Sequence, residues 1–83
     1  MLQVAQLRAA RALLGWRQEE VARAAKISIA TIRRIESQEG VLTGYVSTLV
    51  KIQAAFEQAG IQFIDEDEFG GFGIRMAKKK RKR

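Results

Sequence analysis

The sequence contains no cysteine and no histidine. Without cysteine, disulfides, thiolate zinc sites and thiol catalysis are excluded. Without histidine, the chain lacks the commonest metal ligand and the commonest general base. Apolar runs approaching the ~18 residues that span a bilayer are also missing, as is the pattern of a signal peptide at the N-terminus. We therefore expect a cytoplasmic protein with no membrane association.

Acidic residues form one dense run, at positions 65–68. The run lacks the alternating oxygen ligands and the glycine placement of an EF-hand loop. No nucleophile or base accompanies it, and Gly70, Gly71 and Gly73 make no phosphate-binding fingerprint. We therefore predict solvated loop charge here, with no metal, no cofactor and no enzymatic activity.

Charge is unevenly distributed along this chain of 83 residues, which suffices for one small domain. Residues 78–83 are all basic and account for the whole net charge of +6. Residues 1–35 carry seven basic and two acidic side chains, whereas residues 36–68 carry one basic and seven acidic. A polyanion is therefore expected to bind the first segment and the basic tail, with the acidic segment facing away.

Two short helices joined by a tight turn are predicted within residues 17–36, around which the chain is organised. Apolar residues recur at helical spacing in this segment, at Val21, Ala22, Ala25, Ile27, Ile32 and Ile35. Ser28 occupies the N-cap position of the second helix, where its hydroxyl can accept from the backbone N–H of Ala30 or Thr31. If Ile32 and Ile35 of this helix point inward, four other side chains must point largely outward, those of Ile29, Ala30, Arg33 and Arg34.

Two further helices are predicted to complete the core. One spans residues 4–14, and Gly15 occupies the position just after its last residue. Its apolar residues form one stripe, and Gln6, Arg8 and Arg11 lie outside that stripe. The other spans residues 46–59 and is closed by Gly60. Trp16 is expected to pack at the helix junction.

The C-terminal part alternates like short strands at residues 61–64 and 72–76. The acidic, glycine-bearing segment between them favours a hairpin with a loop longer than two residues. Because an isolated hairpin is marginal in water, it should pack on the helices or pair with a second subunit.

The segment from Leu14 to Glu36 resembles the helix-turn-helix of the lambda-repressor-like (Xre/Cro-type) DNA-binding family. Members commonly show Leu-Gly, a Gln opening the second helix and a third helix of the form Ser-x-x-Thr-Ile-x-x-Ile-Glu. The matching residues here are Leu14, Gly15, Gln18, Ser28, Thr31, Ile32, Ile35 and Glu36. Two positions depart from the pattern. Arg17 replaces the usual Ser or Thr cap, and Lys26 replaces a glycine frequent at the turn, so the backbone there must be strained or adjusted.

The resemblance implies a mainly α fold, a four-to-five-helix lambda-repressor-like domain with a short C-terminal β-hairpin or dimer-pairing strands. Small bacterial relatives carry similar strand-forming tails. We accordingly divide the chain into a helix-turn-helix DNA-binding domain at 1–60, a strand-forming extension at 61–77, and a basic tail at 78–83 that self-repulsion is expected to keep disordered.

The resemblance also implies where DNA binds. Ile29, Ala30 and Arg34 fall near the base-edge positions, where Arg34 can hold guanine O6 and N7 and the apolar side chains can contact a thymine methyl. Phosphates are assigned to Arg17, Gln18, Ser28, Thr31 and Arg33. Arg33 has Glu36 three residues later and can form a local ion pair, whereas Arg34 has no acid at that spacing.

The tail consists of Lys78, Lys79, Lys80, Arg81, Lys82 and Arg83. It is expected to lie along the DNA backbone and to add affinity that depends on salt and not on sequence. The competing interpretations are a solubility tail, a contact with anionic membranes and a nuclear-localisation-like signal.

The predicted function is a sequence-specific transcription regulator, a repressor or autoregulator, acting as a homodimer on double-stranded DNA in the bacterial nucleoid. Dimerisation is inferred from the small surface of one motif and from the spare strand-forming segment. The alternative is an antitoxin-like or anti-activator module whose acidic half or hairpin holds a toxin or activator, with DNA binding secondary. A third hypothesis, non-specific nucleoid or RNA binding through the tail, predicts no footprint on any site.

Overall fold

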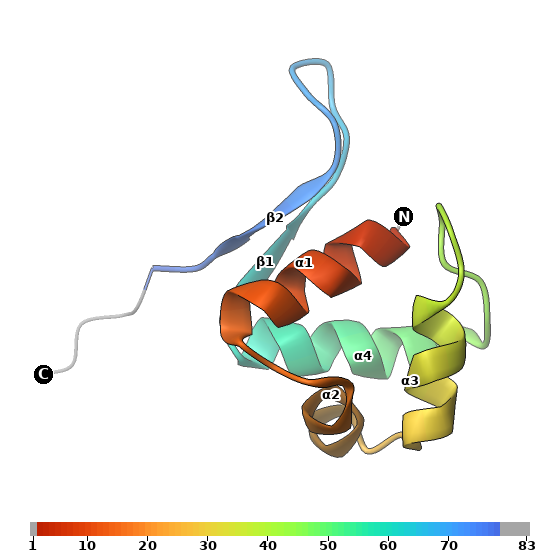
Figure 1. Cartoon of the computed structure of the whole chain (residues 1–83). Coiled ribbons are helices and arrows are strands. Elements are labelled where there is room, and N and C mark those ends of the chain that lie inside the picture. The colour runs from red at the N-terminus through yellow and green to blue at the C-terminus, as the bar shows by residue number, and fades with distance from the viewer. Residues whose placement is uncertain (1, 79–83) are drawn as a thin grey trace, which may run out of the picture.

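The computed structural model describes residues 2–78. Within them, four helices precede two strands, and these elements are α1 (Val4–Leu14), α2 (Gln18–Ala25), α3 (Ile29–Glu36), α4 (Val46–Gln58), β1 (Ile61–Ile64) and β2 (Gly73–Met76). Figure 1 shows the hairpin loop rising on one side of the helices, with α2 and α3 on the opposite side. The prediction of a mainly α fold with a C-terminal hairpin is confirmed, and the number of helices in this range is four.

The core lies where the apolar stripes of all four helices meet the inner face of β1. Its largest fully buried side chains are Phe56, Leu7, Ile32, Ile52, Ile61 and Val21. Trp16 stacks on Phe56 with ring centroids 5.7 Å apart, and Phe63 meets Phe56 edge-on at 6.2 Å. The predicted packing of Trp16 at the helix junction is therefore confirmed.

Local signals mark the helix ends around the tight turn. Ser28 caps α3, since its hydroxyl oxygen accepts from the backbone N–H of Thr31 at 3.2 Å. At the start of α2, the Glu20 carboxylate accepts from the backbone N–H of Arg17 at 2.6 Å, which supports an end that lacks a Ser or Thr cap. Lys26 ends α2 with φ 60°, the one positive φ at a non-glycine residue in the described part of the chain. The predicted adjustment at this position is thus a left-handed backbone.

The hairpin packs on the helices, which confirms one of the two arrangements expected for it. β1 and β2 are antiparallel, with Ile61 opposite Met76 and Ile64 opposite Gly73. Gln6, expected on the polar side of the first helix, is instead 2% exposed and lies beneath the strands. Its amide nitrogen donates to the carbonyls of Ile64 (3.2 Å) and Gly73 (2.8 Å), so a polar side chain joins α1 to the hairpin.

The described part of the chain ends at Lys78, which is exposed beyond β2. The predicted contacts of residues 79–83 lie outside the described residues. No helix between residues 2 and 78 is long and apolar enough to cross a bilayer.

Candidate nucleic-acid interface

Helix α3 packs against the core with one face and exposes the other face to solvent. Ile32 and Ile35 are buried, whereas Ala30, Arg33 and Arg34 are exposed. Ile29 differs from the expectation, because it is only half-exposed and packs partly against the core. It is the first helical residue, and helical side chains lean toward the N-terminus, which brings Ile29 back over the turn.

The expected ion pair between Arg33 and Glu36 is wrong. Glu36 is 6% exposed and faces inward, where the Arg11 guanidinium binds it through two hydrogen bonds, Nε to Oε2 at 2.8 Å and Nη2 to Oε1 at 2.9 Å. No hydrogen bond or ion pair within residues 2–78 engages the guanidinium of Arg33 or of Arg34. Both charges are therefore available on the outer face of α3.

Glu36 is the centre of a polar network that joins three helices. Besides Arg11 on α1, the amide of Gln18 on α2 donates to Glu36 Oε1 at 3.1 Å. Arg8 donates to the backbone carbonyl of Glu36, and Arg11 also donates to the carbonyl of Trp16 at 3.2 Å. Charge-assisted and bidentate hydrogen bonds of this kind are stronger than neutral ones. They fix the position of α3 along its axis, and its rotation about that axis, relative to α1 and α2.

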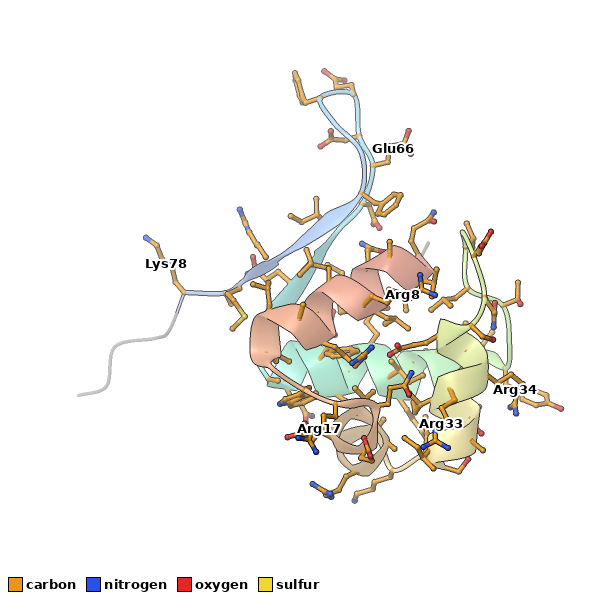
Figure 2. The ribbon with its side chains drawn as sticks, viewed as in Figure 1. Arg8, Arg17, Arg33, Arg34, Glu66 and Lys78 are labelled. Atoms are coloured by element: carbon orange, nitrogen blue, oxygen red, sulfur yellow. The ribbon has the colours of Figure 1, made fainter. Side chains whose placement is uncertain are left out.

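The residues assigned to phosphates lie around this helix. Ser28 donates its hydroxyl proton to Thr31 Oγ1 at 2.9 Å, which leaves the Thr31 hydroxyl proton free for an external acceptor. Gln18 is half-buried, and its bond to Glu36 orients its carboxamide at the start of α2. Figure 2 shows the side chains of Arg17, Arg33 and Arg34 on the side formed by α2 and α3.

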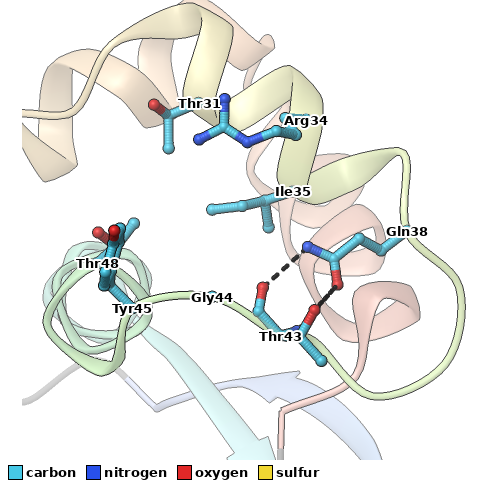
Figure 3. Close-up of a pocket in the computed structure, with 8 residues that line it drawn as sticks. All are labelled: Thr31, Arg34, Ile35, Gln38, Thr43, Gly44, Tyr45 and Thr48. Atoms are coloured by element: carbon cyan, nitrogen blue, oxygen red, sulfur yellow. Dashed lines mark hydrogen bonds between the residues drawn. The ribbon is translucent and has the colours of Figure 1, made fainter.

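A hollow of about 360 Å³ adjoins α3 at Arg34. Its walls come from α3, the following loop and the start of α4, namely Thr31, Arg34, Ile35, Gln38, Thr43, Gly44, Tyr45 and Thr48 (Figure 3). The Gln38 side chain holds the loop, donating to the Thr43 carbonyl and accepting from the Thr43 N–H, both at 2.9 Å. Sequence reasoning did not select Tyr45 for this surface. The available signal was an aromatic residue directly before a predicted helix.

The acidic loop lies far from this surface. Asp67 accepts from the backbone N–H groups of Phe69 (2.8 Å) and Gly70 (3.0 Å), so it shapes the turn of the hairpin. Figure 2 places Glu66 in the hairpin loop, on the side of the molecule opposite Arg33 and Arg34. Of the acidic segment 36–68, the hairpin loop therefore lies away from Arg33 and Arg34, as the charge pattern predicted, whereas Glu36 lies on α3 itself.

The profile of the family described as Helix-turn-helix matches residues 7–58, more than half of the chain and all of α2, α3 and α4. No curated protein matches this sequence. The family is of the lambda-repressor (Xre) type, a DNA-binding regulatory family that is generally not enzymatic. The chain therefore belongs to the lambda-repressor-type helix-turn-helix family of DNA-binding regulators.

Proposed function

We propose that this protein is a sequence-specific repressor or autoregulator that binds double-stranded DNA as a homodimer. The observation that supports this most directly is the outer face of α3. It presents the Arg33 and Arg34 guanidiniums with no acidic partner within residues 2–78, while the nearest acid, Glu36, is turned inward and held by Arg11. A short helix braced by a second helix and carrying free donors has the form that enters a major groove.

In this proposal the side chains divide by position. Arg34 binds a guanine through O6 and N7, and Ala30, with the exposed part of Ile29, contacts a thymine methyl. Phosphates are held by Arg17, Gln18, Ser28, Thr31 and Arg33, which surround the helix and fix its register on the duplex. Tyr45 adds a hydroxyl donor beside Arg34, at the edge of the same surface.

A homodimer is proposed because one α3 of eight residues spans few base pairs. Two copies related by a two-fold axis double the number of bases read and require a site with matching symmetry. The tail, residues 78–83, adds sequence-independent attraction to the backbone of the same DNA, and we place the protein at the nucleoid of the bacterial cytoplasm.

The test is selection of genomic fragments by the purified protein, followed by footprinting of the enriched sequence. We expect a protected site with two-fold symmetry, bound more tightly than random DNA of equal length at two salt concentrations. Equal affinity for selected and random DNA would contradict sequence-specific regulation. The genes beside the enriched site then identify the regulated operon.

A second candidate is an antitoxin-like or anti-activator module, favoured by the hairpin tip. Phe69 is 89% exposed and follows the acidic run directly, so an apolar ring and several carboxylates are presented together. Such a surface suits a basic protein partner with an apolar depression. Stoichiometric co-purification of a protein that is lost from Phe69→Ser but retained by Arg34→Ala would support this candidate.

A further inference from the structure

Strand β2 has an open hydrogen-bonding edge. Beyond the strand ends, the Ala77 N–H donates to the Gly60 carbonyl at 2.7 Å. Opposite residues of an antiparallel pair alternate between hydrogen-bonded and non-hydrogen-bonded. Counting from Ala77 and Gly60, the pair Arg75 and Gln62 is hydrogen-bonded, so the backbone groups of β2 that point toward β1 are those of Gly73 and Arg75. The N–H and C=O groups of Ile74 and Met76 therefore point away from β1. No hydrogen bond in the described residues uses them.

The side chains at the start of β1 are more buried than those at the end of β2, although Ile64, which ends β1, is 37% exposed. Ile61 is buried, and Phe63 packs edge-on against Phe56 of α4. Along β2, by contrast, Met76 is 45% exposed, and Phe72, just before the strand, is 41% exposed. An unpaired edge flanked by exposed apolar side chains favours pairing with another strand.

We propose that β2 pairs antiparallel with β2 of a second copy of this chain, about a two-fold axis that sets Ile74 opposite Ile74 of the partner subunit. This inference rests on the proposed homodimer and names its interface. The two hairpins then form one four-stranded sheet, and the outward groups of Ile74 and Met76 gain hydrogen-bond partners.

This register follows from the side chains. It sets Phe72 opposite Met76 of the partner subunit, so the two exposed apolar side chains cover each other on one face. On the other face it sets Arg75 opposite Gly73 of the partner subunit. A shift that centres the pairing on Arg75 would place two arginines directly opposite, and like charges in that position are destabilising.

The charges of the hairpin select the antiparallel direction. Figure 2 shows Glu66 at the loop end of the hairpin and Lys78 at the opposite end. Antiparallel pairing brings unlike ends together, and in this register Lys78 is level with Gly70 of the partner subunit, beside its acidic turn. A parallel arrangement would bring two acidic turns together.

The test compares Met76→Pro with Met76→Ala in the full chain. Both remove the thioether, but only proline removes the outward N–H, and the ladder to β1 does not use that group. By sedimentation equilibrium without DNA, we expect the dimer dissociation constant of Met76→Pro to be about 10- to 30-fold higher than that of Met76→Ala, since two donors are lost per dimer. Circular dichroism checks that both variants fold.

A cysteine cross-link tests the register with no change to the backbone donors. The wild-type chain has no cysteine, and a Cβ at Gly73 meets nothing within 4 Å. The double variant Gly73→Cys/Arg75→Cys should form a covalent dimer under mild oxidation, whereas either single variant should not, because each introduced thiol faces the other position. The matched control on the neighbouring strand is Gln62→Cys/Ile64→Cys, which should remain uncoupled.

Three outcomes overturn the proposal. The first is equal dissociation constants for the two Met76 variants together with no cross-link between positions 73 and 75, which would place the dimer interface elsewhere. If Val50→Lys then dissociated the dimer, the interface would be the exposed apolar side of α4. Cross-linking of the control pair would assign the edge of β1. A wild-type chain that is monomeric at every concentration would remove the homodimer as well, while the role of Arg34 in binding DNA is measured separately.

Discussion

The Arg11 guanidinium holds both carboxylate oxygens of Glu36, at 2.8 and 2.9 Å, across the contact between α1 and α3. The side chains lie 25 residues apart in sequence, and Glu36 is almost fully buried. This pair has two consequences. It fixes the end of α3 against the body of the domain, and it removes the one acid that Arg33 would otherwise meet on its own helix.

Replacing Arg11 with Met should therefore destabilise the domain strongly. The change leaves a buried carboxylate without its charged partner, for which a loss of about 3 kcal/mol in the free energy of unfolding is expected. Urea unfolding followed by circular dichroism measures it. The matched control is Arg23→Met, which removes an exposed arginine from α2 and should change stability by less than about 0.5 kcal/mol. Equal midpoints for both variants would show that the pair contributes nothing.

Arg34→Ala and Arg33→Ala should affect DNA binding differently. We expect Arg34→Ala to cost about 1–3 kcal/mol on the selected site and to relax specificity at one base pair, because a bidentate guanine contact is lost. Arg33→Ala should weaken selected and random DNA by a similar factor. Gel-shift titration on both DNAs separates the two. Lys51→Ala, an exposed cation on α4, is the control and should leave both affinities unchanged. Equal losses on the two DNAs for both arginine variants would contradict the assignment.

Lys26→Gly should stabilise the domain. Lys26 has φ 60°, a left-handed conformation that costs a residue with a Cβ about 1–2 kcal/mol. Glycine relieves this cost but adds freedom to the unfolded chain, so a net gain of about 0.5–1 kcal/mol is expected. Thermal unfolding measures the change. Lys26→Ala removes the same charge and keeps the backbone strain, so it should show no gain. A gain shared by both variants would attribute the effect to charge.

The features that local sequence signals could predict are those within one turn or one strand. Ser28 and Gly15 mark helix ends by capping chemistry, and the predicted bounds of α1 agree with the structure. The alternation of apolar and polar residues predicted the second strand of the hairpin, with a start one residue before that of β2. Each of these depends on contacts between residues close in sequence, for which spacing alone is sufficient.

The features that sequence analysis missed depend on contacts between distant segments. Spacing on one helix suggested Arg33 as the partner of Glu36, whereas the fold offers Arg11. Gln6 was assigned to a polar face by its residue type, but the two strand carbonyls above it make burial favourable. Tyr45 joins the α3 surface only because the loop after α3 folds back beside Arg34. A linear pattern does not contain these distances.

Gln6→Leu should loosen the hairpin more than the helices. The variant fills a similar volume, but it removes the donor to the carbonyls of Ile64 and Gly73, so a loss of about 1–3 kcal/mol in the free energy of unfolding is expected. Amide hydrogen exchange should show faster exchange in β1 and β2 than in α4. The comparison is Gln53→Leu, which removes a more accessible amide from α4 and should leave strand exchange unchanged. Uniformly faster exchange throughout the domain would mean that Gln6 supports the core as a whole.

Deleting residues 78–83 should weaken binding to all DNA without changing specificity. Six cations are lost, and each that neutralises a phosphate contributes about 0.9 to the slope of log K against log salt concentration. We expect a shallower slope for the truncated chain and the same ratio of affinities for selected and random DNA. Fluorescence anisotropy across a salt series measures both quantities. The control replaces the six residues with an uncharged Gly-Ser segment of equal length, which should behave like the deletion because charge, and not length, supplies the affinity. An unchanged slope would assign the tail a role other than DNA contact, and a changed ratio would show that the tail contacts bases.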